Sequence, residues 1–411
     1  MAVGIAEISI MRTSLEQYVT SANDAIHIKL VKTPSDIDDD SKNFHPEFTH
    51  QLFGQSENIF GYKNLKIQLY YSAGLLNLYL GKTCSEKLDP TRLDNIPADD
   101  IAKVIIEKLG VHPTDSLDKF RSELSKEDSF TPFGDLLHSY SVHKNGEDTQ
   151  FEIYKCDTTT PGFIKYHERL QTFLWWFIDA VSYINIDDDR WIFYVVYERS
   201  VINGKPQHSV VGYCTVYKYY AYPTKIRPRI SQMLILPPYQ RQGHGAQLLE
   251  AIYIDHRQNP TVLDITVEDP SEEFICLRDY VDCKVCMHLA SFSTECLQEG
   301  FTEDMAQEAQ VKLKINQKQA RRVYEILRLR VTDESNANQF KEYRLDIKKR
   351  LNIPYQREKS DMEKMKKALK PEELAATMAG QSLQERHNNL EKMFQELLVD
   401  YRKVVERLAR S

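Results

Sequence analysis

A strand, a glycine turn, a helix and a second strand follow one another between Ile230 and Val267, and this order constrains the fold most. The first strand, Ile230–Leu236, is an apolar run that Pro237 ends. Ala246–His256 then repeats apolar residues on one helical face, and Val262–Val267 is a second apolar run of strand length. A helix that connects two strands predicts an α/β unit.

The turn before this helix, Gln240–Gly245, fits the pattern Gln/Arg-x-x-Gly-x-Gly/Ala. Glycines let a backbone approach a ligand closely, and the first N–H groups of a helix bind anions, so the turn predicts a phosphate cradle. A third glycine for a dinucleotide fingerprint and the Gly-Lys-Ser/Thr of a Walker A loop are both missing. The alternative is a glycine-rich helix start without a ligand.

Strands and helices alternate through the first two thirds of the chain, and a wholly helical pattern follows from about residue 290. The other predicted elements are strands at 25–30, 65–69, 76–80, 191–198 and 209–222, and helices from Ile101, from about Pro161 to Ala180 and from near Pro270. A polar stretch at 125–135 resembles a domain boundary. We expect a mixed α/β (α+β) fold with an N-terminal α/β domain at 1–130, a central domain at 131–290 and a helical region at 291–411.

The last helix carries apolar residues at heptad spacing. They are Leu383, Leu390, Phe394, Leu397, Tyr401, Val404 and Leu408. Such a seam predicts either a helix packed on its own domain or a helix that binds a partner.

Composition excludes several classes of protein. The net charge of −7 and the pI of about 6.0 argue against a basic nucleic-acid-binding surface. No apolar run approaches the length of a membrane helix, and the N-terminus lacks the basic start of a signal peptide. Seven cysteines, an odd number, do not form a disulfide framework and favour a reducing intracellular compartment.

Longer stretches of sequence carry a more specific resemblance. They are Arg229–Leu236, Gly243–Glu250, Val262–Pro270, Tyr166–Phe173 and Ala320–Leu329. The strand-turn-helix pattern resembles the GNAT acyltransferases, and these stretches resemble the type B histone acetyltransferase catalytic subunits. The resemblance implies a GNAT core, acetyl-CoA as acetyl donor and the N-terminal tail of newly made histone four as substrate. It also implies a WD-repeat histone-binding partner of the retinoblastoma-associated type, and a location in nucleus and cytoplasm.

The same resemblance assigns the cofactor site to a strand end and the turn after it. Met233, Leu234 and Ile235 are expected to offer backbone groups to the pantetheine arm, in the splay between two parallel strands. The residues expected to wrap the pyrophosphate are Gln240, Arg241, Gln242, Gly243, His244, Gly245 and Ala246.

Lysine acetylation needs a base, because neutralising an ammonium of pKa ~10.4 near pH 7.4 costs about 4 kcal/mol. Glu268 and Asp269 lie at the end of a predicted strand. Asp269 fits the N-cap of the helix from Pro270, so Glu268 is the better base, as the family's assignment also implies. Asp179 matches a third position implicated in catalysis, where close relatives carry the longer Glu; the alternative is an ordinary acid at a helix end.

The resemblance also implies residues that contact the histone tail. They are Glu57, Trp191, Tyr217, Lys218 and Tyr219. Glu57 matches an acidic loop that meets the histone tail in the family. Gln55 and Ser56 make this loop less acidic than in close relatives, so the affinity for the peptide or its register in the site is expected to differ. The aromatic residues match a lysine channel, and the alternative for them is the core of a strand.

A zinc site and two other functions are the remaining alternatives. Cys283-x-x-Cys286 with His288 resembles half of a zinc site, but the second ligand pair is missing from the sequence, so no metal is expected. The alternative functions are a GNAT enzyme for protein N-termini or small amines, and a histone-binding scaffold without activity.

Overall fold

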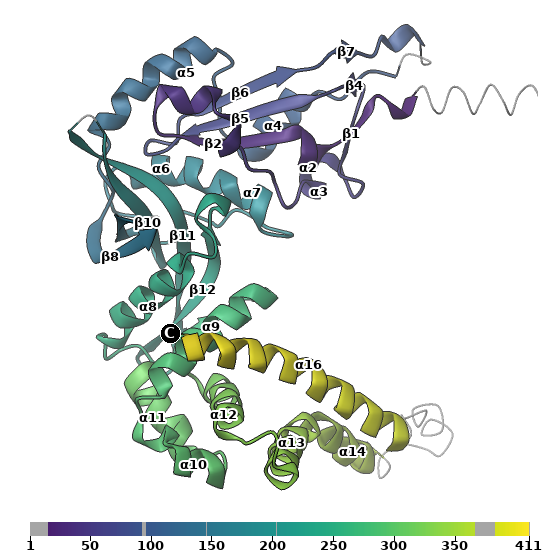
Figure 1. The fold of residues 1–411 in the computed structure, drawn as a ribbon, viewed down its shortest axis with the longest axis vertical. Helices are drawn as coiled ribbons and strands as arrows, with labels where there is room; N and C mark the ends of the chain where they lie inside the picture. Colours follow the sequence, from purple (N-terminus) through teal and green to yellow (C-terminus); the bar gives the residue numbers. More distant parts are fainter. Residues whose placement is uncertain (1–14, 93–95, 145, 203, 366–382, 411) are drawn as a thin grey trace, which may run out of the picture. The chain divides into compact units, whose positions relative to one another are not determined.

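The computed structural model describes residues 15–92, 96–144, 146–202, 204–365 and 383–410, which form two compact units (Figure 1). Unit 1 comprises the chain up to Lys218 together with Ile230–Ala251. Unit 2 comprises Tyr219–Arg229 together with the chain from Ile252. The mixed fold with a helical C-terminal region is confirmed, and the division at residues 130 and 290 stays a prediction.

The N-terminal part of unit 1 is built on a three-stranded sheet in the order β2-β5-β6, with β2 and β5 parallel and β5 and β6 antiparallel. The elements are β1 (Val19–Ser21), α2 (Ala22–Ala25), β2 (Ile26–Val31), η1 (Pro34–Asp38), η2 (Asp40–Lys42), α3 (His50–Phe53), β3 (Asn58–Phe60), β4 (Tyr62–Lys63), β5 (Lys66–Ser72), β6 (Leu78–Thr83), β7 (Glu86–Lys87), η3 (Pro90–Arg92), α4 (Ile101–Leu109), α5 (Leu117–Glu123) and η4 (Leu124–Ser129). The strands predicted at 25–30, 65–69 and 76–80 are confirmed within three residues.

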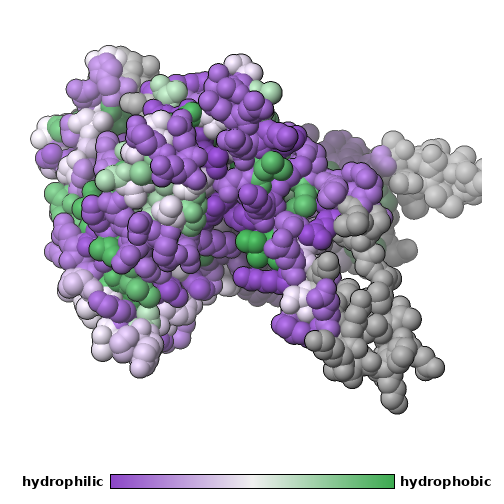
Figure 2. Space-filling view, turned by 90° about the horizontal axis from the view of Figure 1, so that it is seen from below, coloured by the Kyte–Doolittle hydropathy of each residue, from purple (hydrophilic) through white to green (hydrophobic). Residues whose placement is uncertain are grey.

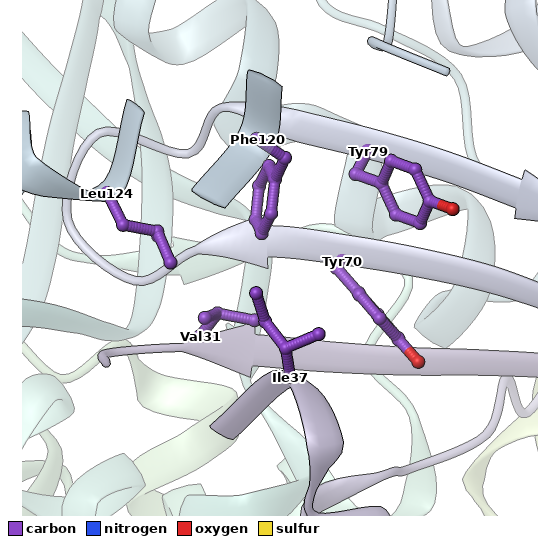
Figure 3. Packing of buried hydrophobic residues seen from close by; sticks show 6 residues of the cluster. All are labelled: Val31, Ile37, Tyr70, Tyr79, Phe120 and Leu124. Carbon is purple, nitrogen blue, oxygen red and sulfur yellow. The ribbon is translucent and has the colours of Figure 1, made fainter. Parts of the chain in front are cut away.

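One face of this sheet is covered by α5. Figure 3 shows Phe120 of α5 and Leu124 in one cluster with Val31, Tyr70 and Tyr79 of the three strands. Phe120 is fully buried. Burial of an aromatic side chain of this size stabilises a fold by about 2–3 kcal/mol, which fixes α5 against the sheet.

The larger sheet of unit 1 runs in the order β12-β11-β10-β9-β8. Its strands are β8 (Asp135–Lys144), β9 (Glu147–Asp157), β10 (Trp191–Ile202), β11 (Lys205–Ala221) and β12 (Lys225–Ile235), and the helical segments with it are α6 (Phe163–Leu170), η5 (Gln171–Phe173), α7 (Leu174–Phe177), η6 (Pro237–Tyr239) and α8 (His244–Arg257). The strand, turn and helix predicted from Ile230 are therefore confirmed.

The helix predicted from about Pro161 to Ala180 is confirmed as a continuous helical stretch, but it is shorter and less regular than expected. The segment begins at Phe163, tightens to a 3-10 turn at Gln171–Phe173 and ends at Phe177. Thr172 explains the change of geometry, because its hydroxyl donates to Arg169 O at 2.6 Å and competes with the helical ladder. Asp179 therefore lies in a turn beyond the helix rather than on it.

Unit 2 is almost wholly helical, as predicted. It contains β13 (Thr266–Val267) and the helices α9 (Glu272–Cys286), η7 (Ala290–Phe292), α10 (Thr294–Glu299), α11 (Glu303–Leu313), α12 (Gln317–Val331), α13 (Ala337–Leu351), α14 (Ile353–Met365) and α16 (Leu383–Arg410). The strand predicted at 262–267 is reduced to its last two residues, and isolated parallel bridges join Val262 to Ile226 and Ile265 to Ile315.

The heptad seam of α16 packs on its own unit. The helix lies against α9, α12 and α13, and Phe394, Tyr401 and Val404 are buried there. The predicted seam contained Leu397, which is half-buried. Its neighbour Leu398 is buried instead. The first of the two alternatives for this helix is therefore confirmed.

Figure 2 shows one face of the molecule, mostly hydrophilic, with hydrophobic residues in small separate groups. Scattered apolar residues of this kind are normal on a protein surface. Among the described residues, no helix combines the length and the apolar character that a membrane crossing requires.

Candidate active site

The turn between β12 and α8 is braced by its own amide side chains. Gln240 Nε2 donates to Ile235 O at 2.9 Å, and Gln242 Nε2 donates to Pro238 O at 2.9 Å. Between them the backbone turns at Arg241 with φ 59°, and it turns again at Gly243 with φ 94°. Glycine suits the second position because an L side chain is strained at such a φ.

The first residues of α8 are anchored by side chains that point inward. His244 is 1% exposed, its Nδ1 lies 2.8 Å from Tyr140 Oη, and its ring lies 4.3 Å from that of Phe151. Ala246 is also buried, and its N–H and that of Gln247 begin the helical ladder on Gly243 O. The N–H groups of His244 and Gly245 come before this ladder, at the helix N-terminus where anions bind, whereas the N–H of Ala246 is already engaged with Gly243 O.

A glycine that the sequence analysis did not single out shapes the strand before the turn. A Cβ at Gly212 of β11 would lie 2.3 Å from Leu234 O, so only glycine allows β11 to approach β12 this closely. Leu236 N also donates to Val211 O at 2.9 Å. Met233–Ile235 thus have a fixed backbone, and a glycine inside a strand pattern was the signal that could have found Gly212.

In unit 2 the chain that leads to Glu268 is held by two arginines. Arg227 pairs with the buried carboxylate of Asp264, with Nε 2.5 Å from Oδ1, and Arg278 donates to Ile265 O at 3.0 Å. Ile226 and Val262 form a parallel bridge in the same unit. Glu268 follows β13 and is exposed, which a residue that collects a proton from a substrate requires.

The predicted N-cap role of Asp269 is wrong. Helix α9 begins at Glu272, and its cap is Ser271, whose hydroxyl accepts from Phe274 N at 3.2 Å. Asp269 is exposed and lies outside the helix in the left-handed region, at φ 32°. Capping therefore no longer distinguishes Asp269 from Glu268 as a base.

Asp179 and Glu57 meet at one histidine in unit 1. His50 Nε2 lies 3.3 Å from Asp179 Oδ1, and its Nδ1 lies 3.8 Å from Glu57 Oε1. Glu57 Oε1 also accepts from the N–H groups of Thr49 and His50, at 2.6 and 2.9 Å. The hydrogen bond from Thr49 N is the main reason why the pKa of Glu57 is lowered. The structure thus joins two of the predicted site residues through His50, which the sequence analysis missed.

Trp191 and Tyr217 form a cross-strand pair on β10 and β11. Their rings lie 4.9 Å apart, edge to face, and both side chains are half-buried. Tyr217 Oη donates to Asp188 Oδ2 at 2.8 Å. Hydrogen bonds from the Arg190 guanidinium are the main cause of the lowered pKa of Asp188. The two rings are therefore held in a fixed orientation. They are half-buried, so they do not belong to a closed strand core, which was the alternative for these residues.

The two remaining predicted contacts lie at the next positions of β11. Lys218 is half-buried, and its N–H donates to Arg190 O at 3.1 Å. Tyr219, in unit 2, is 40% exposed, and the Arg229 guanidinium lies 4.7 Å from its ring centre. Arg229 thus covers one face of the Tyr219 ring, and a lysine stem would have to meet the other face or displace the guanidinium.

The cysteine pair of the zinc hypothesis lies inside α9. Cys283 and Cys286 are fully buried, and burial raises the pKa of both thiols. The described residues contain no group of three or more side chains that could hold a metal ion.

Comparison with protein-family models assigns most of the chain. Residues 18–179 match the histone acetyl transferase HAT1 N-terminus, residues 150–272 match the acetyltransferase (GNAT) family, and residues 278–329 match the C-terminal model of the histone acetyltransferase type B catalytic subunit. The braced turn of unit 1 lies within the GNAT match.

Curated relatives match this sequence over most or nearly all of its length. The histone acetyltransferase type B catalytic subunit of Homo sapiens is 50% identical over 405 residues, which are 98% of this chain and 96% of that protein. A protein with the same description from Dictyostelium discoideum is 35% identical over 83% of this chain and 74% of its own length. A solved aminoglycoside acetyltransferase from a soil sample is 17% identical over 32% of this chain and 84% of its own, at a TM-score of 0.24, too slight a likeness to argue from. The chain therefore belongs to the type B histone acetyltransferase catalytic subunits, a family of GNAT acetyltransferases.

Proposed function

We propose that this acetyltransferase moves the acetyl group of acetyl-CoA directly to lysines in the N-terminal tail of newly synthesised histone four. The observation that carries the proposal is the braced turn Gln240–Gly243 at the N-terminus of α8. Backbone N–H groups there suit the pyrophosphate, and the fixed strand Met233–Ile235 suits the pantetheine arm. The proposed protein partner is a WD-repeat histone-binding protein of the retinoblastoma-associated type, and the proposed compartments are nucleus and cytoplasm.

In the proposed reaction Glu268 takes a proton from the lysine ammonium, and the neutral amine attacks the thioester carbonyl carbon. The C–N bond forms as the C–S bond breaks, and coenzyme A leaves as the thiolate, which takes up a proton. Trp191 and Tyr217 would line the lysine stem. Glu57 and Asp179 would add negative charge that attracts the basic tail.

The test is transfer of radiolabelled acetyl from acetyl-CoA to a peptide of the histone-four tail, with the modified lysine located by mass spectrometry. A matched peptide with arginine in place of lysine keeps the charge and removes the acceptor amine. We expect label on the lysine peptide alone. Label on neither peptide contradicts the proposal, and label on a free N-terminus or a small amine in preference to the lysine favours the other GNAT activity.

A further inference from the structure

Unit 1 contains a cavity of about 370 Å³ that lies outside the residues assigned to acetyl transfer. Five short segments form its walls: the β5–β6 turn, the loop after α4, α5, the end of α6 and η5. The lining residues are Tyr71, Leu76, Asn77, Leu78, Val111, His112, Pro113, Thr114, Lys119, Glu123, Arg169 and Thr172. This volume is at the lower end of that of small-molecule sites.

The walls are held from several sides. Thr114 N donates to Leu78 O at 2.8 Å, and Leu80 N donates to Thr114 O at 3.0 Å, which ties the loop to the edge of β6. Tyr71 Oη lies 3.0 Å from Thr172 Oγ1, which ties β5 to η5. The cavity therefore belongs to the folded unit and does not depend on a loose surface loop.

Helix α5 presents two charged side chains to the cavity, because its apolar face is packed on the sheet. Phe120 and Leu124 point onto the sheet (Figure 3). Lys119 and Glu123 precede them by one residue each and, being four apart, share a neighbouring helical face. Both line the cavity, with Lys119 exposed at its rim.

Arg169 is the unusual member of the lining. Its Nε is buried and makes no hydrogen bond within the described part of the chain. Burial lowers the pKa of its guanidinium, and the nearby acidic groups of Tyr166, Glu168 and Glu127 oppose this only in part. The Glu127 carboxylate is itself held by the N–H groups of Gly74 and Leu75, at 2.6 and 3.1 Å.

A guanidinium stays charged, and a charge that is withdrawn from water is normally paired. The Arg169 side chain is half-buried, its Nε has no acceptor within the described residues, and it lines a cavity whose other fixed charges are one lysine and one carboxylate. Tyr71, Leu76, Leu78 and Val111 provide apolar wall beside it. The missing partner is thus an anion that also has an apolar part.

We propose that this cavity binds a small organic oxyanion, a carboxylate or phosphate monoester, through Arg169 and Lys119, with its apolar part against Tyr71 and Val111. Arg169 provides the planar fork that carboxylate and phosphate oxygens match, and Lys119 adds charge at the rim. The site is separate from acetyl transfer and does not require it.

The test is calorimetry with phenyl phosphate and benzoate as probes, on the full chain saturated with coenzyme A, so that the turn before α8 is not available to them. Benzamide is the uncharged control for benzoate, and inorganic phosphate lacks the apolar part. We expect both organic anions to bind more tightly than either control. Tighter benzoate than phenyl phosphate assigns the site to carboxylates, and the reverse order assigns it to phosphates.

Arg169→Gln should weaken binding of the anions at least about tenfold, because a charge-assisted fork is lost. Lys119→Gln lies on the exposed rim, so it tests the same site without risk to the fold, and a several-fold loss is expected. Lys126→Gln removes an exposed lysine outside the lining and is the matched control. The proposal is overturned by the absence of binding, by benzamide binding as well as benzoate, or by affinities that neither lining variant changes beyond the Lys126→Gln control.

Discussion

Single side chains in this acetyltransferase serve local structure and the candidate site at once. Glu57 provides the carboxylate that holds the N–H groups at the start of α3, where Thr49 makes no side-chain cap. Its backbone is left-handed, at φ 49°, and Asn23 Nδ2 donates to its other oxygen at 3.0 Å. A histone tail would therefore meet a carboxylate that is oriented before the tail binds.

The carboxylates of Glu57 and Asp179 should make peptide affinity depend on salt. Both lie beside His50, and added ions screen the attraction between negative side chains and a basic peptide. Affinity for a histone-four tail peptide should therefore fall as the salt concentration rises. The fall should be smaller in Asp179→Asn, whereas acetyl-CoA affinity should be the same in both proteins. Calorimetry at low and high salt checks this, and a peptide affinity that salt does not change contradicts it.

Glu268→Gln should lower the rate of acetyl transfer by about 10²–10⁴-fold, the usual cost of losing a general base. The defect should shrink as pH rises from 7 to 9, because more of the lysine arrives neutral. Acetyl-CoA affinity should stay nearly constant, and calorimetry provides that control.

Asp269→Asn is the companion variant, since Ser271 rather than Asp269 caps α9. A modest loss is expected, without the same pH trend. A Glu268→Gln rate within threefold of wild type at pH 7.5, beside a large loss in Asp269→Asn, would transfer the role of base to Asp269.

At the scale of elements, the strand-turn-helix at Ile230–Arg257 could be predicted because its signals are local: an apolar run, two prolines, two glycines and a periodic helix. The break at Gln171–Phe173 could not, because it depends on the Thr172 hydroxyl and on Tyr71, about one hundred residues away in sequence. The same holds for the His50 cluster, whose members come from α3, the loop after it and the turn after α7. Sequence periodicity contains no information on such contacts.

Gly243→Val should reduce acetyl-CoA affinity at least about tenfold, because a β-branched residue is strained by about 1–2 kcal/mol at φ 94° and changes the turn before α8. Gly110→Val is a matched control. Gly110 also has a positive φ, of 69°, and open space around it. It lies at the end of α4, outside the turn before α8. Both variants should lose similar stability on heating, and only Gly243→Val should lose affinity by calorimetry. Affinity within twofold of wild type would show that the turn does not bind acetyl-CoA.

At the scale of the whole molecule, one buried carboxylate joins three helices of unit 2 that are distant in sequence. Glu325 of α12 is fully buried and accepts from Arg350 of α13, with Nε 2.6 Å from Oε1, and from Tyr401 of α16, with Oη 2.9 Å from Oε2. Arg321 completes the set, with its Nε 2.9 Å from Oε1. A buried charge of this kind costs free energy unless every oxygen is paired, so the network specifies how α16 docks.

Tyr401→Phe should therefore lower the free energy of unfolding by about 1.5–3 kcal/mol, the value of a hydrogen bond to a charged group. Glu325→Gln should cost more, about 3–5 kcal/mol, because it leaves Arg350 without its buried counter-charge and Arg321 with Asp346 alone. Tyr222→Phe is the control, since Tyr222 belongs to the same unit and is 86% exposed. Urea unfolding of the full chain gives all three values, and limited proteolysis should cleave within α16 first in the two destabilised variants. If Tyr401→Phe and Tyr222→Phe unfold at the same midpoint, the hydroxyl does not hold α16, and apolar burial at Phe394 and Val404 accounts for its docking.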